Sequence, residues 1–370
     1  MIAFKLILGN MTPITIAGVR ITGIASAVPE CIRTVDEDAI AFPDSDVSKI
    51  SDSTGVRKRH IVTGNLCTSD LCFAATERLF IESGVERNSI DVLLFVSQTP
   101  DYVLPATSCS LHSRLALDKH CASFDVNLGC SGYIYGLWLA SNLIACGSAK
   151  RALLLAGDTI SRIAAPKDRS VALLFGDAGT ATILERDDDS LPMSFVLGTD
   201  GSGQKNLIVP AGGFRIPRSE ETAIQTEHEG GNIRSEEHLY MNGPEIFTFT
   251  LKEVPGMVKS LVTDYDAIDA VVMHQANKFM LDYIAKRLKI PKEKLIVTLE
   301  NYGNTSSASI PLALTDALSQ KLKNTSLNLL LAGFGVGYSW GAVTVTCGPM
   351  VMPELVLVPE TAAMQFSQEI

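Results

Sequence analysis

Two aliphatic segments recur in this chain at almost the same spacing, and this repeat limits the folds that the chain can adopt. Residues 153–157 (LLLAG) recur as 329–333, which is 176 positions further on, and 90–96 (IDVLLFV) resembles 268–274 (IDAVVMH), which is 178 positions further on. Each copy is short and aliphatic, as expected of a buried strand. Two matches in nearly constant register predict a duplicated unit.

Helical patterns accompany the repeated strands. After residues 268–274, the apolar residues Met280, Ile284 and Leu288 recur every four positions along 278–288, which predicts a helix with one apolar face. Strand, helix and strand in each half predict an α/β fold, in which helices cover mixed, largely parallel sheets.

The repeat also predicts how the chain divides. We expect one half at 12–190, a second at 191–348, and a C-terminal tail at 349–370 for which the sequence indicates no partner. No linker separates the halves, so they should share one interface. Residues 198–237 are glycine-rich and charged without a period, which predicts a long surface loop of the kind that often covers an active site.

Composition excludes several classes of protein. Of 370 residues, 46% are apolar and 19% charged, which demands a large core and excludes intrinsic disorder. A net charge of −10 argues against a nucleic-acid or anionic-membrane partner. The chain has no apolar run of about 18 residues and no framed signal peptide, so we predict a cytoplasmic protein. Its eight cysteines form no CxxC pair, so no zinc ribbon is expected, and the size of the chain argues against a disulfide scaffold.

Cys130 is the first candidate for chemistry. It follows a predicted strand end and a turn glycine in DVNLGC, and a nearly all-apolar helical pattern starts at Ser131. A thiol at a helix N-terminus lies near unpaired N–H groups and the positive end of the dipole, which favour the nucleophilic thiolate. The alternative is a small cysteine used for packing, which suits most of the other seven.

His274 ends the aliphatic strand VVMH and opens the segment HQAN. A histidine between a strand and a helix is well placed to act in a cleft. The alternative is a hydrogen-bonded core histidine.

Asn304 lies in a strand-to-helix turn, NYGNTSSASIP, that corresponds within three residues to Cys130 in the repeat. The two halves would then present Cys130 and Asn304 from related turns, although an ordinary turn residue is the alternative. Ser306 or Ser307 is expected to cap the following helix.

The segment 334–341 (FGVGYSWG) follows the second LLLAG and fails the dinucleotide-binding fingerprint. Its glycines favour close backbone approach, with N–H groups available to a developing oxyanion.

Together these motifs resemble the ketoacyl-acyl-carrier-protein synthase III enzymes of the thiolase superfamily. The resemblance covers about residues 17–347, with every signature in order. The matching segments are DVNLGC before and at Cys130, HQAN at 274–277, NTSSA at 304–308, FGVG at 334–337, TGVRKRH at 54–60 and FGDAG at 175–179. The family fold implied is a duplicated thiolase-like α/β fold, layered α-β-α-β-α with two mixed five-stranded sheets, in a homodimer.

The resemblance implies a decarboxylating condensation of an acyl thioester with malonyl-acyl-carrier protein. Cys130 would carry the acyl group, while His274 and Asn304 would hydrogen-bond the malonyl thioester as its enolate forms. The backbone N–H groups of Cys130 and Val336 would hold the acyl oxyanion. The substrates would be acyl-CoA and malonyl-acyl-carrier protein, and neither a metal nor a redox cofactor would be needed.

Further roles follow from the same resemblance. Asn277 and Arg169 match substrate contacts, and Leu104 stands where family members have a Phe that bounds the acyl pocket, which favours chains longer than acetyl. Residues 49–55 lack the Trp and Arg that hold the coenzyme A adenine in the family. Three basic residues would form a patch for the acidic carrier protein: Lys278, Arg57 and Arg59.

Three other functions remain open. Two keep the Cys, His and Asn: an acyltransferase of a specialised pathway, and an enzyme that condenses two acyl-CoA molecules. The third is a non-catalytic partner subunit.

Overall fold

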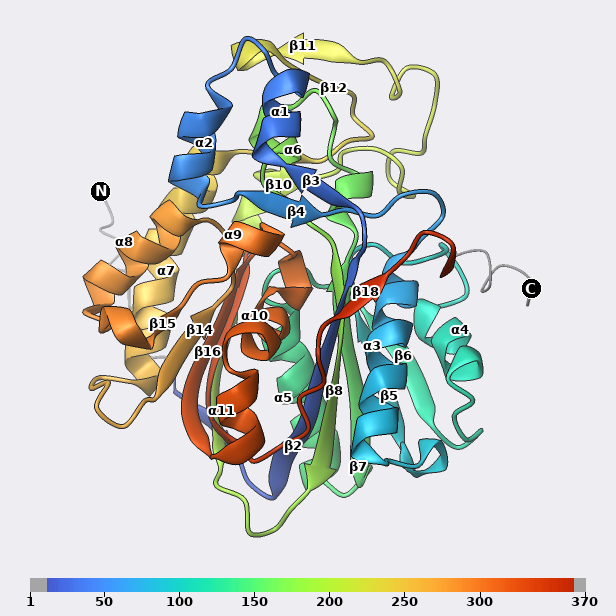
Figure 1. The fold of residues 1–370 in the computed structure, drawn as a ribbon, viewed down its shortest axis with the longest axis vertical. Helices are drawn as coiled ribbons and strands as arrows, with labels where there is room; N and C mark the ends of the chain where they lie inside the picture. The colour runs from blue at the N-terminus through green and yellow to red at the C-terminus, as the bar shows by residue number, and fades with distance from the viewer. Residues whose placement is uncertain (1–11, 363–370) are drawn as a thin grey trace, which may run out of the picture.

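The computed structural model describes residues 12–362, which form two mixed six-stranded sheets (Figure 1). The strands of the first sheet are, in order, β18 (Val356–Val358), β2 (Val19–Pro29), β8 (Ala178–Arg186), β7 (Arg151–Asp158), β5 (Val92–Val96) and β6 (Ala122–Val126). Those of the second are β1 (Ile14–Ile16), β9 (Met193–Thr199), β17 (Ser339–Cys347), β16 (Leu327–Gly335), β14 (Ala270–Met273) and β15 (Leu295–Ile296).

The predicted duplication is confirmed by the positions of the repeated strands. The two LLLAG segments lie in β7 and β16, and each of these strands pairs antiparallel with the strand that follows it in the chain, β8 or β17. The second pair of segments lies in β5 and β14, each parallel to its LLLAG strand. Equivalent strands therefore occupy equivalent places in the two sheets.

Each sheet has six strands rather than the five expected, because each receives a short edge strand from the opposite end of the chain. The N-terminal β1 pairs antiparallel with β9, and the C-terminal β18 pairs parallel with β2. The tail at 349–370, for which the sequence indicates no partner, thus contributes a strand to the first sheet. By sequence, β1 belongs to the predicted half at 12–190, but it pairs in the second sheet. Likewise, β18 belongs to the predicted tail at 349–370, but it pairs in the first sheet.

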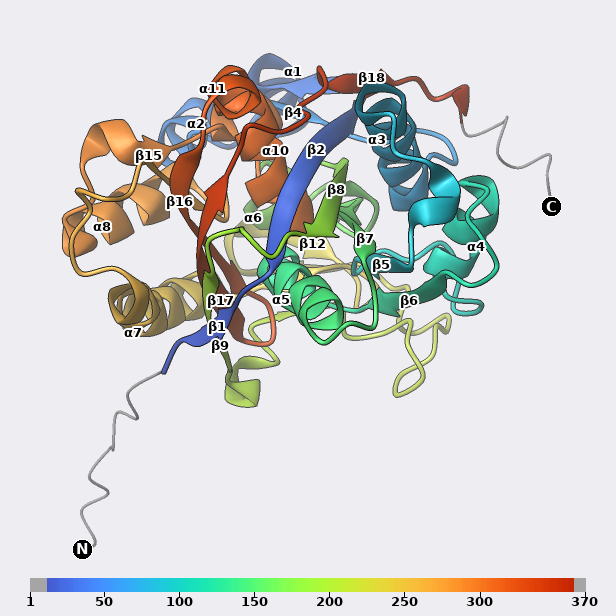
Figure 2. The ribbon, with the colours of Figure 1, turned by 90° about the horizontal axis from the view of Figure 1, so that it is seen from below.

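Helices form three layers around the sheets (Figures 1 and 2). The outer face of the first sheet is covered by α3 (Thr68–Ser83) and α4 (Thr107–Arg114), and that of the second by α7 (Gly243–Leu261) and α8 (Lys278–Leu288). Between the sheets lie α5 (Gly132–Ala145) and α10 (Ser309–Ala317). The predicted α-β-α-β-α layering is confirmed.

Side-chain alternation explains the layers. In β7, Leu153 and Leu155 pack with the α3 cluster, whereas Leu154 and Ala156 pack with the α5 cluster. A strand covered on both faces needs apolar residues at every position, which is why the repeat reads as a continuous aliphatic run.

Short elements complete the described chain. Several gather beyond one end of the sheets, at the top of Figure 1: α1 (Val35–Ala41), α2 (Val47–Thr54), β3 (Ile32–Thr34), β4 (Lys58–His60), α6 (Arg169–Ala172), β10 (Leu207–Ile208), β11 (Thr226–His228), β12 (Asn232–Arg234) and β13 (Tyr240–Met241). The others are α9 (Leu299–Tyr302) and α11 (Ser319–Asn324), with short 3-10 turns at 87–89, 160–162, 201–203, 229–231, 292–294 and 306–308. The predicted loop at 198–237 holds three two- or three-residue strands and two of these turns. No helix within residues 12–362 has the length and apolarity to cross a membrane.

Candidate active site

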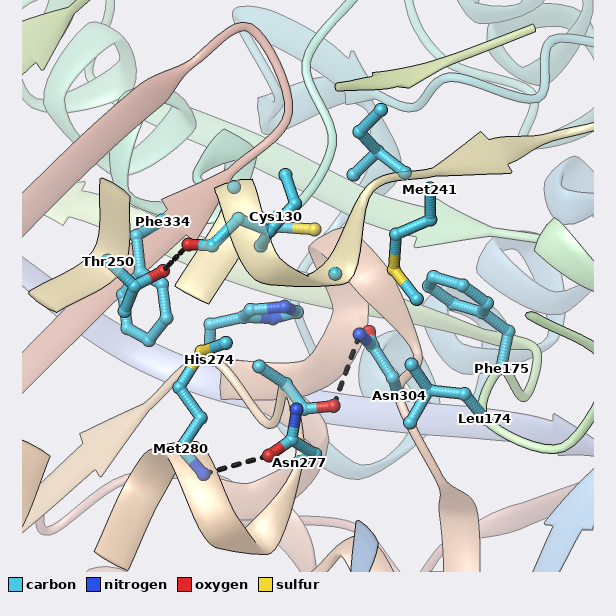
Figure 3. Close-up of a pocket in the computed structure, with 15 residues that line it drawn as sticks. Cys130, Leu174, Phe175, Met241, Thr250, His274, Asn277, Met280, Asn304 and Phe334 are labelled. Carbon is cyan, nitrogen blue, oxygen red and sulfur yellow. Dashed lines mark hydrogen bonds between the residues drawn. The ribbon is translucent and has the colours of Figure 1, made fainter. Parts of the chain in front are cut away.

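Cys130, His274 and Asn304 line one cavity of about 80 Å³. Figure 3 shows the Cys130 sulfur, the His274 ring and the Asn304 amide facing the same space. The rest of the lining is mostly apolar, and it includes Leu174, Phe175, Leu207, Met241, Ile246, Met280 and Phe334. The sequence therefore predicted three residues from separate elements that the fold brings together.

Cys130 lies in the turn between β6 and α5, two residues before the helix begins at Gly132. Gly132 and Gly136 let this helix approach the sheet, because a Cβ at either position would lie within 2.6 Å of a β5 or β7 side chain. Close packing thus buries the first turn of α5 and the thiol beside it.

Burial, followed by the charge of Asp158, raises the pKa of the Cys130 thiol to about 11. The backbone N–H groups of Val336 and Cys130 act in the opposite direction. Burial therefore opposes the effect that the sequence predicts from the helix N-terminus, which favours the thiolate.

The glycines at the end of β16 make the predicted close approach to Cys130. A Cβ at Gly333 would lie 2.8 Å from the Cys130 carbonyl oxygen. A Cβ at Gly335 would lie 2.9 Å from the Cys130 sulfur. Only glycine leaves room for the nucleophile turn at these two positions.

His274 follows β14, and its backbone N–H donates to the Ala332 carbonyl on β16. Its Nδ1 lies 2.7 Å from the Ser309 hydroxyl of α10, and its ring meets Phe334 edge-on. Burial lowers the pKa of His274 to about 3, so the imidazole is neutral near pH 7. His274 thus combines both sequence interpretations: it is a hydrogen-bonded core residue, and it lines the cavity.

Asn304 is held by its own turn. Its Oδ1 accepts from the Ser306 N–H at 2.9 Å, and its backbone pairs with Phe175 in an isolated bridge. The expected cap at Ser306 or Ser307 is wrong, because α10 begins at Ser309 with Ala308 as its N-cap. Ser306 instead adopts a left-handed φ of 51°, and its hydroxyl lies 3.9 Å from the Cys130 sulfur.

The predicted substrate contacts separate in space. Asn277 lines the cavity and caps α8 through the Met280 N–H. Arg169 does not line the cavity. Its guanidinium lies beside Gly230 and donates to the Ser45 hydroxyl. Leu104 is 79% exposed and lies outside the cavity of its own chain.

The predicted carrier-protein patch needs a correction. Arg59 is buried, where it pairs with Asp38 and donates to the Ala172 carbonyl, so it cannot contribute to a surface patch. Arg57 and Lys278 remain at the surface, each paired with a carboxylate of its own helix region, Asp52 or Asp282. A run of consecutive basic residues does not reveal which of the side chains is buried.

Sequence reasoning missed Asp158, although it directly follows the first LLLAG segment. It is fully buried at the carboxyl end of β7, close enough to Cys130 to influence the pKa of the thiol. A polar residue that ends a strand of a detected repeat is a signal that could have identified it. Within residues 12–362, no group of three or more His, Cys, Asp or Glu side chains is placed to hold a metal ion.

Two family models match the chain. One, described as 3-oxoacyl-[acyl-carrier-protein (ACP)] synthase III, matches residues 124–201, and the model of its C terminal matches 261–347. Beta-ketoacyl-[acyl-carrier-protein] synthase III of Natranaerobius thermophilus is 35% identical over 88% of this chain and 98% of its own length. The enzyme of the same name from Symbiobacterium thermophilum is 36% identical over 89% and 98%.

Solved structures give the same result. A 3-oxoacyl-(acyl-carrier protein) synthase from Burkholderia xenovorans LB400 has a TM-score of 0.88 and 42% identity, covering 94% of this chain and 99% of that one. The synthase III of Pseudomonas aeruginosa PAO1 has a TM-score of 0.78 and 31% identity, covering 91% and 100%.

A duplicated α/β fold in which Cys, neutral His and Asn meet at one cavity defines a thiolase-like condensing enzyme. Within that class, the chain belongs to the beta-ketoacyl-acyl-carrier-protein synthase III family.

Proposed function

We propose that this chain catalyses the decarboxylating condensation of an acyl thioester with malonyl-acyl-carrier protein, which yields a 3-oxoacyl thioester for fatty-acid biosynthesis. The observation that carries the proposal is the shared cavity of Cys130, neutral His274 and Asn304 in a chain of this family. A soft nucleophile that also leaves well, beside uncharged donors, suits two successive thioester reactions.

In the first step, the Cys130 sulfur attacks the acyl thioester carbonyl. A new carbon–sulfur bond forms, the bond to the carrier sulfur breaks, and the thiol proton leaves with the released carrier thiol. The N–H groups of Cys130 and Val336 hold the oxyanion, a role supported by the position of both N–H groups beside the thiol.

In the second step, the malonyl thioester loses carbon dioxide, and its electron pair moves toward the thioester oxygen. His274 and Asn304 donate hydrogen bonds to that oxygen. The resulting carbon nucleophile attacks acyl-Cys130, the carbon–sulfur bond to Cys130 breaks, and the 3-oxoacyl thioester leaves while the Cys130 sulfur takes up a proton from water. No metal or redox cofactor enters these steps. Asn277 lines the cavity, and in this proposal it contacts the carrier arm.

Intact-mass measurement tests this proposal. The protein is incubated with acyl donors from acetyl to octanoyl, on coenzyme A and on carrier protein, and malonyl-acyl-carrier protein is then added. We expect a mass gain on the Cys130 peptide, followed by carbon dioxide and 3-oxoacyl product. Acylation without carbon dioxide would favour transfer to another acceptor, and no acylation with any donor would favour a non-catalytic subunit.

We also propose a homodimer that pairs along β6. This strand ends the first sheet, with Phe124 partly exposed, and the exposed Tyr102, Val103 and Leu104 follow the neighbouring β5. An apolar edge of this kind favours strand pairing between copies. Light scattering should give twice the chain mass for the wild type and a shift toward the single-chain mass for Phe124→Asp. A wild-type protein that stays monomeric at assay concentration would contradict this proposal.

A further inference from the structure

Asp158 is fully buried, and no ion pair is formed with it in the described part of the chain. Its Oδ1 accepts from the Gln98 N–H at 2.7 Å and from the Ser97 hydroxyl at 3.2 Å, just beyond β5. Its Oδ2 accepts from the Ser307 N–H at 3.1 Å and the Ser307 hydroxyl at 2.7 Å. The carboxylate therefore joins the strand ends of the first half to the turn that precedes α10 in the second half.

The turn that Asp158 holds has a strained backbone. Ser306 has a φ of 51°, a left-handed conformation that residues other than glycine adopt at a cost. Two successive N–H groups of this turn are bound by carboxylate or amide oxygens: Ser306 by Asn304, and Ser307 by Asp158. The strained conformation is thus fixed from both sides.

Ser306 connects this turn to the reacting groups. Its hydroxyl lies 3.9 Å from the Cys130 sulfur, and its N–H holds the Asn304 side chain. Burial lowers the pKa of His274, and the backbone of Ser306 partly opposes that effect, which places Ser306 beside the His274 ring. A shift of Ser306 would therefore disturb Cys130, His274 and Asn304 together.

We propose that Asp158 is a positioning residue for the proposed condensation: it fixes the Ser306–Ser307 turn so that Asn304 and His274 keep their places around Cys130. The proposal rests on the proposed function, because it concerns the same site. A buried carboxylate without a cation is costly, and its four hydrogen bonds are directed entirely at the two segments that carry or support the site.

The pH at which Cys130 ionises depends on the charge of Asp158, and it would not change if Asp158 had a purely structural role. Burial raises the pKa of Asp158, and its hydrogen bonds with Gln98 and Ser307 act in the opposite direction. The titratable groups that Asp158 affects are Cys130 and Cys72: burial, followed by Asp158, raises the pKa of each thiol. His274, the other titratable residue at Cys130, is already neutral. Removing the Asp158 charge should therefore let Cys130 ionise at lower pH.

The test compares Asp158→Asn with the wild type, using iodoacetamide as a probe and peptide mass spectrometry to follow each thiol. We expect the pH midpoint of Cys130 alkylation to fall by about one unit, since a like charge is removed. Condensation should fall roughly 100-fold through misplacement of the reacting groups. The exposed Cys146, at the far end of α5, is an internal reference whose rate should not change.

Asp177→Asn is the matched control, since Asp177 is equally buried and accepts N–H groups of Val62 and Ser161. It should leave the Cys130 profile unchanged. Ser307→Ala covers the case in which Asp158→Asn does not fold, because it removes one hydrogen bond and keeps the charge. It should slow condensation without moving the alkylation midpoint.

The proposal is overturned if Asp158→Asn condenses at the wild-type rate, or if Asp177→Asn shifts the Cys130 midpoint equally. A Ser307→Ala variant with full condensation activity would also count against it when Asp158→Asn fails to fold. If the wild type forms no product with any donor, the proposed function fails. The alkylation profiles do not depend on a substrate, so they still decide whether Asp158 acts on Cys130.

Discussion

Gly335→Ala should abolish acylation of Cys130. The added Cβ would lie 2.7 Å from the Cys130 Cβ and 2.9 Å from its sulfur, closer than side-chain carbons approach one another. Gly335 cannot retreat easily, because β16 is paired with β17 up to the Gly335–Ser339 pair. The nucleophile must move instead, and it then loses its alignment with the neighbouring N–H groups.

The size of this effect follows from two losses. A displacement of about 1 Å costs roughly 100-fold, and a lost oxyanion donor costs a further factor of about 100, so a decrease of roughly 10,000-fold is expected. The measurement is the rate of mass gain on Cys130 with a saturating acyl donor.

Gly341→Ala is the control for overpacking in general. A Cβ there would lie 2.8 Å from Leu197 and 2.9 Å from Ile134, which are side-chain ends that can shift. This variant should lose about 1–3 kcal/mol of unfolding free energy and keep its acylation rate. Wild-type acylation in Gly335→Ala would show that the Cys130 turn does not depend on the close approach.

The sequence predicts the centre of this fold better than its edges. Strands β5, β7, β14 and β16 are covered on both faces, so each needs apolar residues at successive positions, and the sequence shows a continuous aliphatic run. The edge strands β1 and β18 have three residues each, too few to carry a periodic pattern. Their pairing partners are set by where the chain ends reach in the folded molecule, and this depends on tertiary structure alone.

The site shows the same division. Cys130, His274 and Asn304 were identified because each ends a strand or begins a turn in a repeated pattern. The raised pKa of Cys130 was missed because burial and the approach of Asp158 come from residues distant in sequence. Arg59 was misplaced because neighbouring basic residues alternate between the surface and a buried pair with Asp38.

His274→Ala should reduce malonyl decarboxylation roughly 100- to 1,000-fold, the usual cost of removing one donor to a developing oxyanion. Acylation of Cys130 should be affected much less, because the acyl oxyanion is assigned to the N–H groups of Cys130 and Val336. Carbon dioxide release and Cys130 mass gain, measured on the same sample, separate the two steps. His274→Gln keeps an N–H donor and should recover part of the lost rate. Equal losses in both steps would contradict the assignment of His274 to the enolate.

The lowered pKa of His274 makes a second part of this argument testable. With a pKa of about 3, His274 stays neutral, so decarboxylation should not lose rate to histidine protonation between pH 7 and pH 5.

Stability should change over the same range. Unfolded histidine binds a proton near pH 6.5, whereas folded His274 does not. The unfolding free energy therefore falls by about 1.4 kcal/mol for each pH unit below 6.5 from this residue alone. Urea unfolding of wild type and His274→Gln at pH 7.5 and pH 5 isolates the contribution of His274. As the pH falls, the unfolding free energy of the wild type should decrease more than that of the variant. A constant difference would mean that folded His274 titrates like unfolded histidine, and the expectation that decarboxylation keeps its rate between pH 7 and pH 5 would then be wrong.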